Sequence, residues 1–310
     1  MDLSVVIVSW NTRELLRDCL ASLPAATAGL EVEVVVVDNA SADRSAEMVV
    51  ADFPHCRLMD AGGNLGFARA NNLALPHTLG RCVLLLNPDT VCPPGSLTRL
   101  YRFVNSRPGI AAAGPRLVDG DGRPAISWGF FPRARDHWLG FLDPRRLWLR
   151  GPLARRVTVI PARTEPSRPV DYVLGACFLI PRTALEVLGP LDDRYFLYFE
   201  ETDWCWRARQ QGLAVWYCAE TEVTHLEGRA SGQAGGFAQR QFQKSYRLFV
   251  AKNYGAGSLW RFRLAQFAEY GGKALLRRVL PGAGNRAIAA AYWARARLQL
   301  CREIEATPPS

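Results

Sequence analysis

A short apolar run that ends in an acidic turn is the first feature of this sequence that could do chemistry. Residues 84–90 read LLLNPDT, and an apolar run bounded by turn residues predicts a buried strand. Ligands of open α/β sheets gather beyond the carboxyl ends of such strands. Asn87 and Asp89 lie two residues apart, so an extended backbone projects both to the same side. An amide oxygen and a carboxylate there suit a divalent cation, Mg²⁺ or Mn²⁺, that bridges a diphosphate. A plain Pro-Asp turn is the alternative.

A second carboxylate follows another expected strand. Residues 32–37 read VEVVVV, and Asp38 comes directly after them, just before a predicted helix. A carboxylate in that position can accept hydrogen bonds from a ribose or from the edge of a base. An Asx turn or a helix cap at Asp38 and Asn39 is the alternative.

A glycine-rich segment, AGGNLGFARANN at 61–72, separates a short third strand from the next predicted helix. Its glycines let the backbone lie against a ligand, and Arg69 offers a cation to a phosphate. The segment is not the dinucleotide-binding fingerprint, because that motif should follow the first strand. There the sequence reads SWNT, at 9–12.

Acidic and aromatic residues gather at 192–207, which read DDRYFLYFEETDWCWR. A helix is predicted at 201–211. On a helix Glu200 and Asp203 share a face, at i and i+3, while Glu201 points elsewhere. Apolar surroundings raise the pKa of a carboxyl group toward the range of a general base. In the alternative, Glu200 and Glu201 complement a helix N-terminus and Asp203 pairs with Arg207.

One of the four histidines, His225, follows a predicted strand at 214–217 and precedes a loop rich in glycine and serine that runs through Gly236. A lone histidine is most often structural. His225 becomes a candidate metal ligand because a cation needs a ligand beyond Asp89 and the diphosphate oxygens.

The order of elements predicts an α/β fold. Over the first ~120 residues, strand and helix patterns alternate at the spacing of βαβ units, and the strands are continuously apolar, as in a parallel sheet buried on both faces. We expect a loop region with one short helix at 128–169, then a strand at 170–180 whose Gly175 marks a close backbone approach. The chain from Phe237 is predicted to be helical, with breaks at Gly255, Gly257, 271–272 and 281–282. The other predicted strands are 3–9, 57–59 and 82–86. Three further helices are predicted. The first is opened by Thr12 and runs to 23, the second is opened by Ser41 or Asp43 and runs to Asp52, and the third spans 67–75.

Composition excludes several classes of protein. The 310 residues are 49% apolar, so the chain is not disordered, and no apolar run approaches a membrane span. The eight cysteines form no C-x-x-C pair, which favours reduced, mostly buried thiols over a zinc site or a disulfide frame. We expect a cytoplasmic protein, because the first residues lack the basic leader of a signal peptide.

The net charge of +9 is unevenly distributed. Residues 237–305 carry 13 Lys and Arg against 3 Glu, whereas the rest of the chain is almost neutral. This balance indicates a surface for anionic lipid or another acidic partner, with a solvated helical face as the alternative. No nucleic-acid-binding motif accompanies the charge, so we expect no nucleic acid partner.

The ordered set of motifs resembles the family 2 inverting glycosyltransferases of the GT-A fold, most closely the rhamnosyltransferase-like branch. The motifs, which cover roughly residues 3–230, are VVIVSWN, VVVDNASAD, GGNLGFARANN, LLLNPDT, VLGACFLIPR, DDRYFLYFEETDWCWR and VTHLEG. The resemblance implies a Rossmann-like, mostly parallel central sheet with flanking helices, followed by a helical C-terminal extension.

The resemblance also implies roles for single residues. Asn87-Pro88-Asp89 stands at the D-x-D metal motif, with Asp89 as the retained carboxylate and His225 as a further metal ligand. The acid that activates the acceptor falls at Glu201, where Asp is frequent, so Glu200 stays open as the alternative base. The residues implied to line the donor site are Ser9, Asn11 and Asp38 around the nucleoside, and Asn64, Gly66, Phe67 and Arg69 over the base and diphosphate.

The function implied is the transfer of a sugar, L-rhamnose from dTDP-rhamnose, with inversion, to a hydroxyl of a glycan on a polyprenyl diphosphate carrier. Two alternatives are a UDP-hexose or UDP-galactofuranose donor, and a sugar-nucleotide-binding module without turnover. We expect a glycosyltransferase domain at 1–236, with a nucleotide-sugar half at 1–120 and an acceptor half at 170–230. A basic extension at 237–310 would rest at the inner face of the cell membrane.

Overall fold

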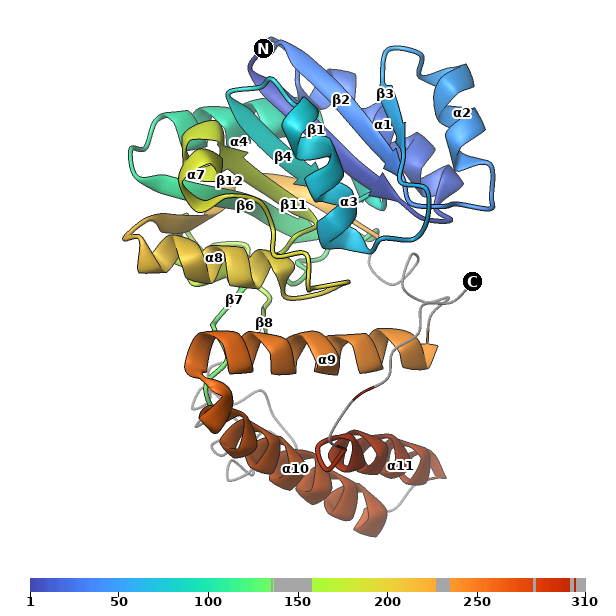
Figure 1. The fold of residues 1–310 in the computed structure, drawn as a ribbon, viewed down its shortest axis with the longest axis vertical. Coiled ribbons are helices and arrows are strands. Elements are labelled where there is room, and N and C mark those ends of the chain that lie inside the picture. Colours follow the sequence, from blue (N-terminus) through green and yellow to red (C-terminus); the bar gives the residue numbers. More distant parts are fainter. Residues whose placement is uncertain (135, 137–157, 227–234, 281–282, 302–303, 305–310) are drawn as a thin grey trace. The chain divides into compact units, whose positions relative to one another are not determined.

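The computed structural model describes residues 1–134, 136, 158–226, 235–280, 283–301 and 304, and Figure 1 traces them. The chain forms two compact units. The first consists mainly of Met1–Phe130 and Thr158–Ala238, and the second of Phe131–Val157 and Gln239–Thr307. Most of the loop region expected at 128–169 and the loop expected after His225 lie outside the described residues.

The first unit alternates strands and helices, as the sequence predicts, and the strands expected at 3–9 and 82–86 are confirmed at those bounds. Its elements in chain order are β1 (Leu3–Ser9), α1 (Arg13–Ala26), β2 (Val32–Asp38), α2 (Ser45–Asp52), β3 (Arg57–Asp60), α3 (Phe67–Ala74), the 3₁₀ turn η1 (Leu75–His77), β4 (Cys82–Leu86), β5 (Thr90–Val91), α4 (Ser96–Asn105), β6 (Ile110–Val118), β7 (Trp128–Gly129), β8 (Thr158–Val159), β9 (Arg168–Val170), β10 (Tyr172–Val173), β11 (Cys177–Pro181), α7 (Arg182–Leu188), α8 (Glu200–Gln210) and β12 (Ala214–His225).

The central sheet has the strand order β3-β2-β1-β4-β11-β6-β12-β5. The four strands β3, β2, β1 and β4 run parallel, and β11 runs antiparallel between β4 and β6. Ser9 pairs with Asp38, and Ile7 pairs with Leu86, so β1, β2 and β4 end at one edge of the sheet. Loops that follow these strands therefore meet at that edge, where ligands of such folds bind.

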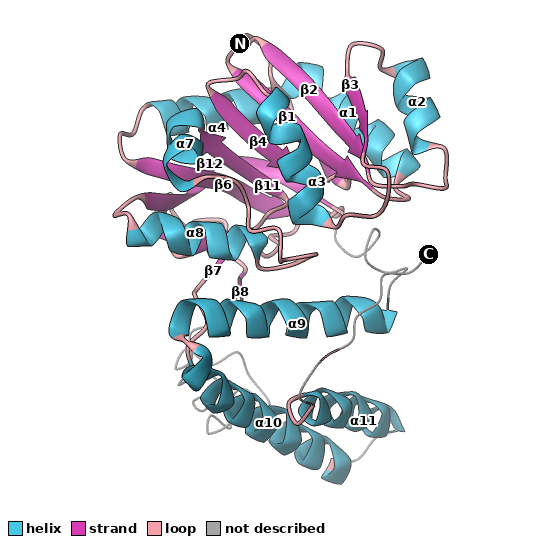
Figure 2. Ribbon diagram, in the orientation of Figure 1, coloured by secondary structure: helices cyan, strands magenta, loops and turns pink. Residues whose placement is uncertain are grey.

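Helices cover both faces of this sheet (Figures 1 and 2). Leu16 and Leu20 of α1 and Leu100 and Phe103 of α4 pack in one cluster with alternate residues of β1 and β4 such as Ile7. Helix α3 contacts β1 and β2, and Figure 1 shows it on the opposite face from α1 and α4. All seven residues of β1 and all five of β4 are buried, which explains why both strands are apolar at almost every position.

Three local predictions are wrong. The strand expected at 170–180 is interrupted, because β9, β10 and β11 are separate strands and Gly175 lies in the loop before β11. The helix expected to open at Ser41 or Asp43 begins at Ser45. Gly257 and residues 271–272 do not break a helix, since all three lie inside α10 (Ala256–Val279). Flanking residues that favour a helix outweigh these glycines, each of which costs only ~1 kcal/mol relative to alanine.

The second unit is helical in the part that the structure describes. Helix α9 (Gly235–Tyr254) begins in the first unit and continues into the second, where α10 and α11 (Ala283–Leu298) pack against each other. The break expected at Gly255 is confirmed, since this glycine precedes α10 with a φ of 83°. Among the described residues, no helix is both long and apolar enough to cross a membrane.

The thiols behave as the sequence predicts. All eight cysteines are free, six of them are buried, and only Cys301 is exposed. Burial raises the pKa of each buried thiol, for example to about 12 at Cys19, so these groups stay protonated and serve as small apolar side chains.

Candidate functional site

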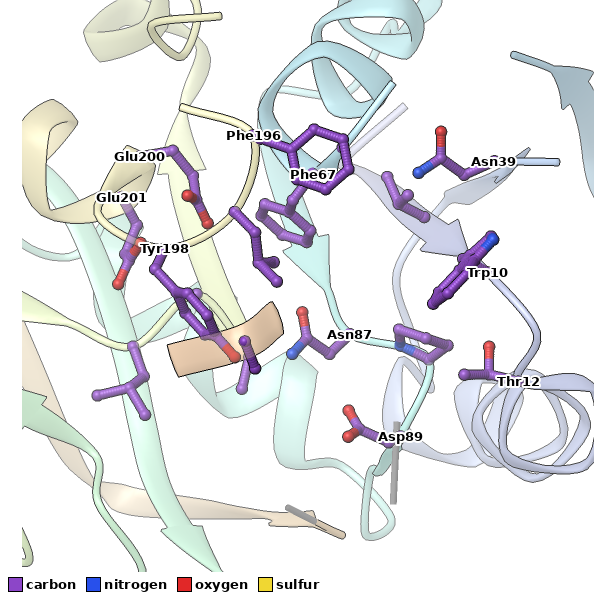
Figure 3. Close-up of a pocket in the computed structure, with 18 of the residues that line it drawn as sticks. Trp10, Thr12, Asn39, Phe67, Asn87, Asp89, Phe196, Tyr198, Glu200 and Glu201 are labelled. Carbon is purple, nitrogen blue, oxygen red and sulfur yellow. The ribbon is translucent and has the colours of Figure 1, made fainter. Parts of the chain in front are cut away.

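A cavity of about 320 Å³ opens at the edge of the sheet where β1, β2 and β4 end. In Figure 3 the labelled acids Glu200 and Glu201 lie on one side of it, Trp10 and Asn39 lie on the other, and Asp89 lies below. The residues that line it are Val8, Trp10, Thr12, Asn39, Asn64, Gly66, Phe67, Asn87, Pro88, Asp89, Leu174, Gly175, Ala176, Phe196, Leu197, Tyr198, Glu200, Glu201, His225, Phe237 and Ala238.

The turn after β4 brings Asp89 and His225 together. Strand β12 runs antiparallel to β5 and pairs His225 with Thr90, and the Leu226 N–H donates to the Asp89 carbonyl at 2.9 Å. His225 Nε2 therefore lies 3.3 Å from Asp89 Oδ1. Both residues are buried, Asp89 at 5% and His225 at 8% exposure, and Asn87 lines the same cavity. The structure thus gathers all three residues that the sequence predicts around the cation.

The side chains of Asp89, His225 and Asn87 suit a divalent cation that binds together with the diphosphate of a nucleotide. Although His225 Nε2 lies 3.3 Å away, no described residue meets the geometry of a hydrogen bond to the buried Asp89 Oδ1, so this acceptor is left for a metal or a donor group. No group of three or more His, Cys, Asp or Glu side chains is placed to hold a metal ion by itself in the described part of the chain. A carboxylate, an imidazole and an amide oxygen leave positions that phosphate oxygens and water can fill, as is usual for Mg²⁺.

The sequence analysis overlooked three side chains at the nucleoside end. Trp10, Thr12 and Asn39 line the cavity, whereas the predicted Ser9, Asn11 and Asp38 do not. Trp10 follows β1 directly, and this aromatic residue after a strand end was the signal in the sequence.

The three predicted nucleoside residues support the loops behind the cavity. Ser9 Oγ lies 3.0 Å from Thr12 Oγ1, and Asn11 Oδ1 accepts the Ala42 N–H at 2.7 Å. Asp38 Oδ2 accepts the Ser41 N–H at 3.2 Å, so the Asx turn considered as the alternative is present. Burial raises the pKa of Asp38, and its Oδ1 has no hydrogen-bond partner among the described residues, so one acceptor remains there.

The glycine-rich segment closes one wall of the cavity. Asn64 Oδ1 accepts hydrogen bonds from Asn39 Nδ2 at 3.0 Å and from the Gly66 N–H at 3.2 Å, which ties this segment to the end of β2. Gly66 has a φ of 78°, and a Cβ built on it would lie 2.3 Å from the Phe196 carbonyl oxygen. Only glycine fits this approach. Arg69 is exposed, pairs with Asp193 and does not line the cavity.

Two acids at the start of α8 form the opposite end. Tyr198 and Phe199 have φ values of 68° and 72°, a left-handed conformation that is rare for aromatic residues and that turns the chain sharply into the helix. Because the first helical turn stands at the rim of the cavity, the consecutive residues Glu200 and Glu201 both line it. Glu200 is only 4% exposed.

Asp203 does not line the cavity with Glu200, although the two lie three residues apart on α8. Asp203 is fully buried away from the cavity, accepts a hydrogen bond from the Tyr195 hydroxyl at 3.2 Å and pairs with Arg207 Nε at 3.3 Å. The alternative pairing with Arg207 is therefore confirmed. The candidate acids are reduced to Glu200 and Glu201.

Burial sets the proton affinity of this acidic pair. It raises the pKa of Glu201 to about 7, and burial together with the neighbouring Glu201 raises the pKa of Glu200 well above its usual value of 4.5. A carboxyl group with a pKa near neutrality can take up a proton during catalysis and release it afterwards.

Aromatic and aliphatic side chains join the two ends. Phe67, Phe196, Leu197 and Phe237 line the cavity between the acids and the nucleoside end, and the Phe196 and Phe237 rings pack edge to face at 5.9 Å. Sequence reasoning missed Phe196, Leu197 and Tyr198, because their placement depends on the left-handed turn that precedes α8.

Comparisons with known proteins show the family of this chain. The family model of glycosyl transferase family 2 matches residues 4–153. An N-acetylglucosaminyl-diphospho-decaprenol L-rhamnosyltransferase of Mycobacterium tuberculosis (strain ATCC 25618 / H37Rv) is 31% identical over 273 residues, which cover 84% of this chain and 86% of that protein. The chain belongs to glycosyltransferase family 2. A low-salt glycan biosynthesis hexosyltransferase, Agl10 of Haloferax volcanii, is 25% identical and covers 80% of this chain and 72% of its own length.

Solved structures confirm the fold of this family 2 glycosyltransferase. The mannosyltransferase PcManGT from Pyrobaculum calidifontis, solved in complex with GDP-Man and Mn²⁺, superposes with a TM-score of 0.59 at 16% identity, covering 96% of this chain and 86% of its own. The expected GT-A architecture and the resemblance to rhamnosyltransferases are confirmed.

Proposed function

We propose that this glycosyltransferase moves L-rhamnose from dTDP-rhamnose to a hydroxyl of a glycan carried on a polyprenyl diphosphate, with inversion at the anomeric carbon. One observation carries the proposal: Asp89 with His225 and the acidic pair Glu200 with Glu201 line a single cavity. A leaving group can be held at one end while a nucleophile is activated at the other. The named activity of the mycobacterial relative supports the choice of sugar and acceptor.

The donor would lie along the cavity from Trp10 to the acids. Trp10, which lines the cavity, would offer an aromatic face to the base. Asp89, His225 and Asn87 would hold a divalent cation, Mg²⁺ or Mn²⁺, against the diphosphate. Such a cation, when bound, neutralises the negative charge that develops on the departing diphosphate.

Proton removal from the acceptor would fall to Glu201. Its carboxylate takes the proton of the acceptor hydroxyl while the hydroxyl oxygen forms a bond to the anomeric carbon. The bond between that carbon and the diphosphate oxygen breaks at the same time, and its electron pair leaves with the diphosphate. With the diphosphate held at Asp89 and the acceptor hydroxyl at Glu201, attack would come from the face opposite to the leaving group and would invert the anomeric centre.

The helical second unit carries a surface that suits a lipid-linked acceptor. Residues 239–301 contain twelve Lys and Arg but one acid, Glu269. On α10, Trp260 is 59% exposed, Leu264 47% and Leu275 64%, and their spacing of four and eleven residues places them on one stripe. Exposed apolar side chains among basic ones are typical of helices that lie in the interface of an anionic membrane.

A vesicle assay tests the membrane contact. The double variant Trp260→Ser, Leu264→Ser should sediment more weakly than wild type with vesicles that contain anionic lipid, and added salt should weaken both. Leu79→Ser, which changes a side chain that is 75% exposed in the first unit, is the matched control. Equal sedimentation of all three proteins would assign this stripe to another partner.

A donor screen tests the proposed reaction. Purified protein is mixed with an acceptor that carries a lipid-linked N-acetylglucosamine, and release of nucleoside diphosphate is followed with Mg²⁺, with Mn²⁺ and with chelator. We expect transfer from dTDP-rhamnose that the chelator abolishes. Transfer from a UDP-hexose or UDP-galactofuranose instead would keep the chemistry and replace the donor. Tight binding of sugar nucleotides without any transfer would favour the non-catalytic module.

A further inference from the structure

We propose that Glu200 is a positioning residue that keeps its proton and donates it in a hydrogen bond to the Glu201 carboxylate. This inference rests on the proposed function, because it assigns the second acid of the same site. In this assignment Glu201 takes the proton of the acceptor, and Glu200 orients Glu201 and stabilises its charged form.

The contact between the two acids requires a proton. Glu200 and Glu201 are consecutive residues at the start of α8, and both line the cavity. Two ionised carboxylates side by side would repel each other and could only accept, so a hydrogen bond between them needs one to keep its proton and donate it. The remaining Oε2 of Glu200 is buried and has no hydrogen-bond partner in the described part of the chain. A charged Glu200 would thus carry an unsolvated oxygen, which is costly.

The hydrogen bonds around the pair show which acid keeps the negative charge. Glu201 Oε1 accepts a hydrogen bond from the Thr202 hydroxyl at 3.4 Å, at the N-terminus of α8. Glu200 is only 4% exposed, and its Oε2 has no hydrogen-bond partner among the described residues. Helix N-termini favour anions, and more donors favour the ionised form. Glu201 is therefore the better place for the charge and Glu200 for the proton.

Among the described residues that line the cavity, no lysine or arginine offers a counter-charge to Glu200. Tyr172 of β10 and Cys205 of α8 face Glu201, and burial raises the pKa of both well above their usual values, so both stay neutral. Gly175 closes the side toward β11, where a Cβ would lie 3.7 Å from Glu201 Cγ. Asp89 and His225 line the same cavity at its other end.

Two substitutions at Glu200 separate this role from the alternatives. Glutamine can donate an N–H to Glu201 as a protonated Glu does, so Glu200→Gln should keep kcat/KM within about tenfold of wild type and leave the acid limb of its pH profile near pH 7. Alanine cannot donate, so Glu200→Ala should raise the midpoint of that limb by about one pH unit. Glu186→Gln, an exposed change on the neighbouring helix α7, is the control.

Each contrary outcome overturns the proposal. A midpoint that falls clearly in Glu200→Gln would mean that Glu200 is charged in wild type and repels Glu201. A midpoint that stays constant in Glu200→Ala would mean that the two acids are not coupled. An inactive Glu200→Gln beside an active Glu201→Gln would exchange their roles.

Thermal unfolding tests the same idea without any substrate. A group whose pKa is raised on folding contributes stability at low pH, and this contribution is lost as pH rises through the folded pKa. If Glu200 keeps its proton, the difference in melting temperature between Glu200→Gln and wild type should shift in favour of the variant as the pH rises from 5 to 8. A constant difference would overturn the proposal even if glycosyl transfer is found, whereas the expected trend without transfer would refute only the proposed function.

Discussion

The two ends of the cavity use acidic residues in opposite ways. At one end Asp89 faces an imidazole, with His225 Nε2 at 3.3 Å and an amide nearby, so its charge meets partners that can share a cation. At the other end Glu200 faces another acid among apolar side chains, and burial raises the pKa of both acids. A carboxylate that binds a cation and a carboxylate that accepts a proton therefore need different surroundings.

The two ends also depend on different parts of the sequence. The Asp89 end follows from strand register, because β4 ends at Leu86 and β12 pairs His225 with Thr90. The acidic end follows from local backbone geometry, in which two left-handed residues, Tyr198 and Phe199, precede α8. Substitutions at the two ends should therefore cause different defects, in metal-dependent donor binding at Asp89 and in proton transfer at the acidic pair.

The largest effect is expected from Asp89→Ala. Loss of the only carboxylate in this turn should abolish transfer and remove the metal-dependent part of donor affinity, while metal-free binding persists. Titration calorimetry with dTDP, with and without Mn²⁺, measures both terms. Asp121→Ala, which changes an exposed turn, is the matched control. Unchanged metal-dependent affinity would remove Asp89 from the cation site.

His225→Ala should produce a milder form of the same defect. The imidazole is one ligand among several, and Asp89 with the diphosphate oxygens would still hold the cation more weakly. The expected signature is a higher metal concentration for half-maximal activity with the protein fully folded. If the metal dependence equals that of wild type, His225 has only a structural role.

The acidic end should appear in the pH profile. Because burial raises the pKa of Glu201 to about 7, the fraction of ionised base falls below this value. The transfer rate at low donor concentration should then drop about tenfold for each pH unit below ~7. A profile that stays flat down to pH 5 would show that no group with this pKa is needed.

Asp203→Asn should reduce stability and leave the chemistry largely intact. This side chain is fully buried and pairs with Arg207 and the Tyr195 hydroxyl, away from the cavity. A loss of ~1–3 kcal/mol in the free energy of unfolding is expected, because the substitution removes the buried charge that pairs with Arg207. Denaturant titration measures the loss of stability, and the transfer rate measured on the same variant shows whether the chemistry is affected. A large loss of rate without loss of stability would return Asp203 to the site.

Much of the fold and the Asp89 end could be predicted from the sequence. Apolar strands that end in Asp38 and in Asn87-Pro88-Asp89 are local patterns, and parallel pairing places their ends at one edge. The pairing of β12 with β5 is non-local, so His225 was identified only through the resemblance and its position after a strand.

The acidic end could be predicted only in part. The segment at 192–207 indicated a site, but the helical pattern grouped Glu200 with Asp203, whereas the structure groups it with Glu201. The reason is the turn at Tyr198 and Phe199, since no propensity rule expects two aromatic residues in the left-handed region. Phe196 was missed for a related reason: its contact with Gly66 joins segments 130 residues apart.

The central claim is that Glu201 takes the proton of the acceptor, and one comparison tests it directly. Transfer rate and donor affinity are measured together for Glu201→Gln, Glu200→Gln and Asp203→Asn. Glutamine keeps the size and most hydrogen bonding of Glu201 but accepts no proton, so Glu201→Gln should lose about 10²–10⁴-fold in turnover with donor affinity retained. The other two variants should lose far less. A Glu201→Gln protein that stays near the wild-type rate would contradict the account.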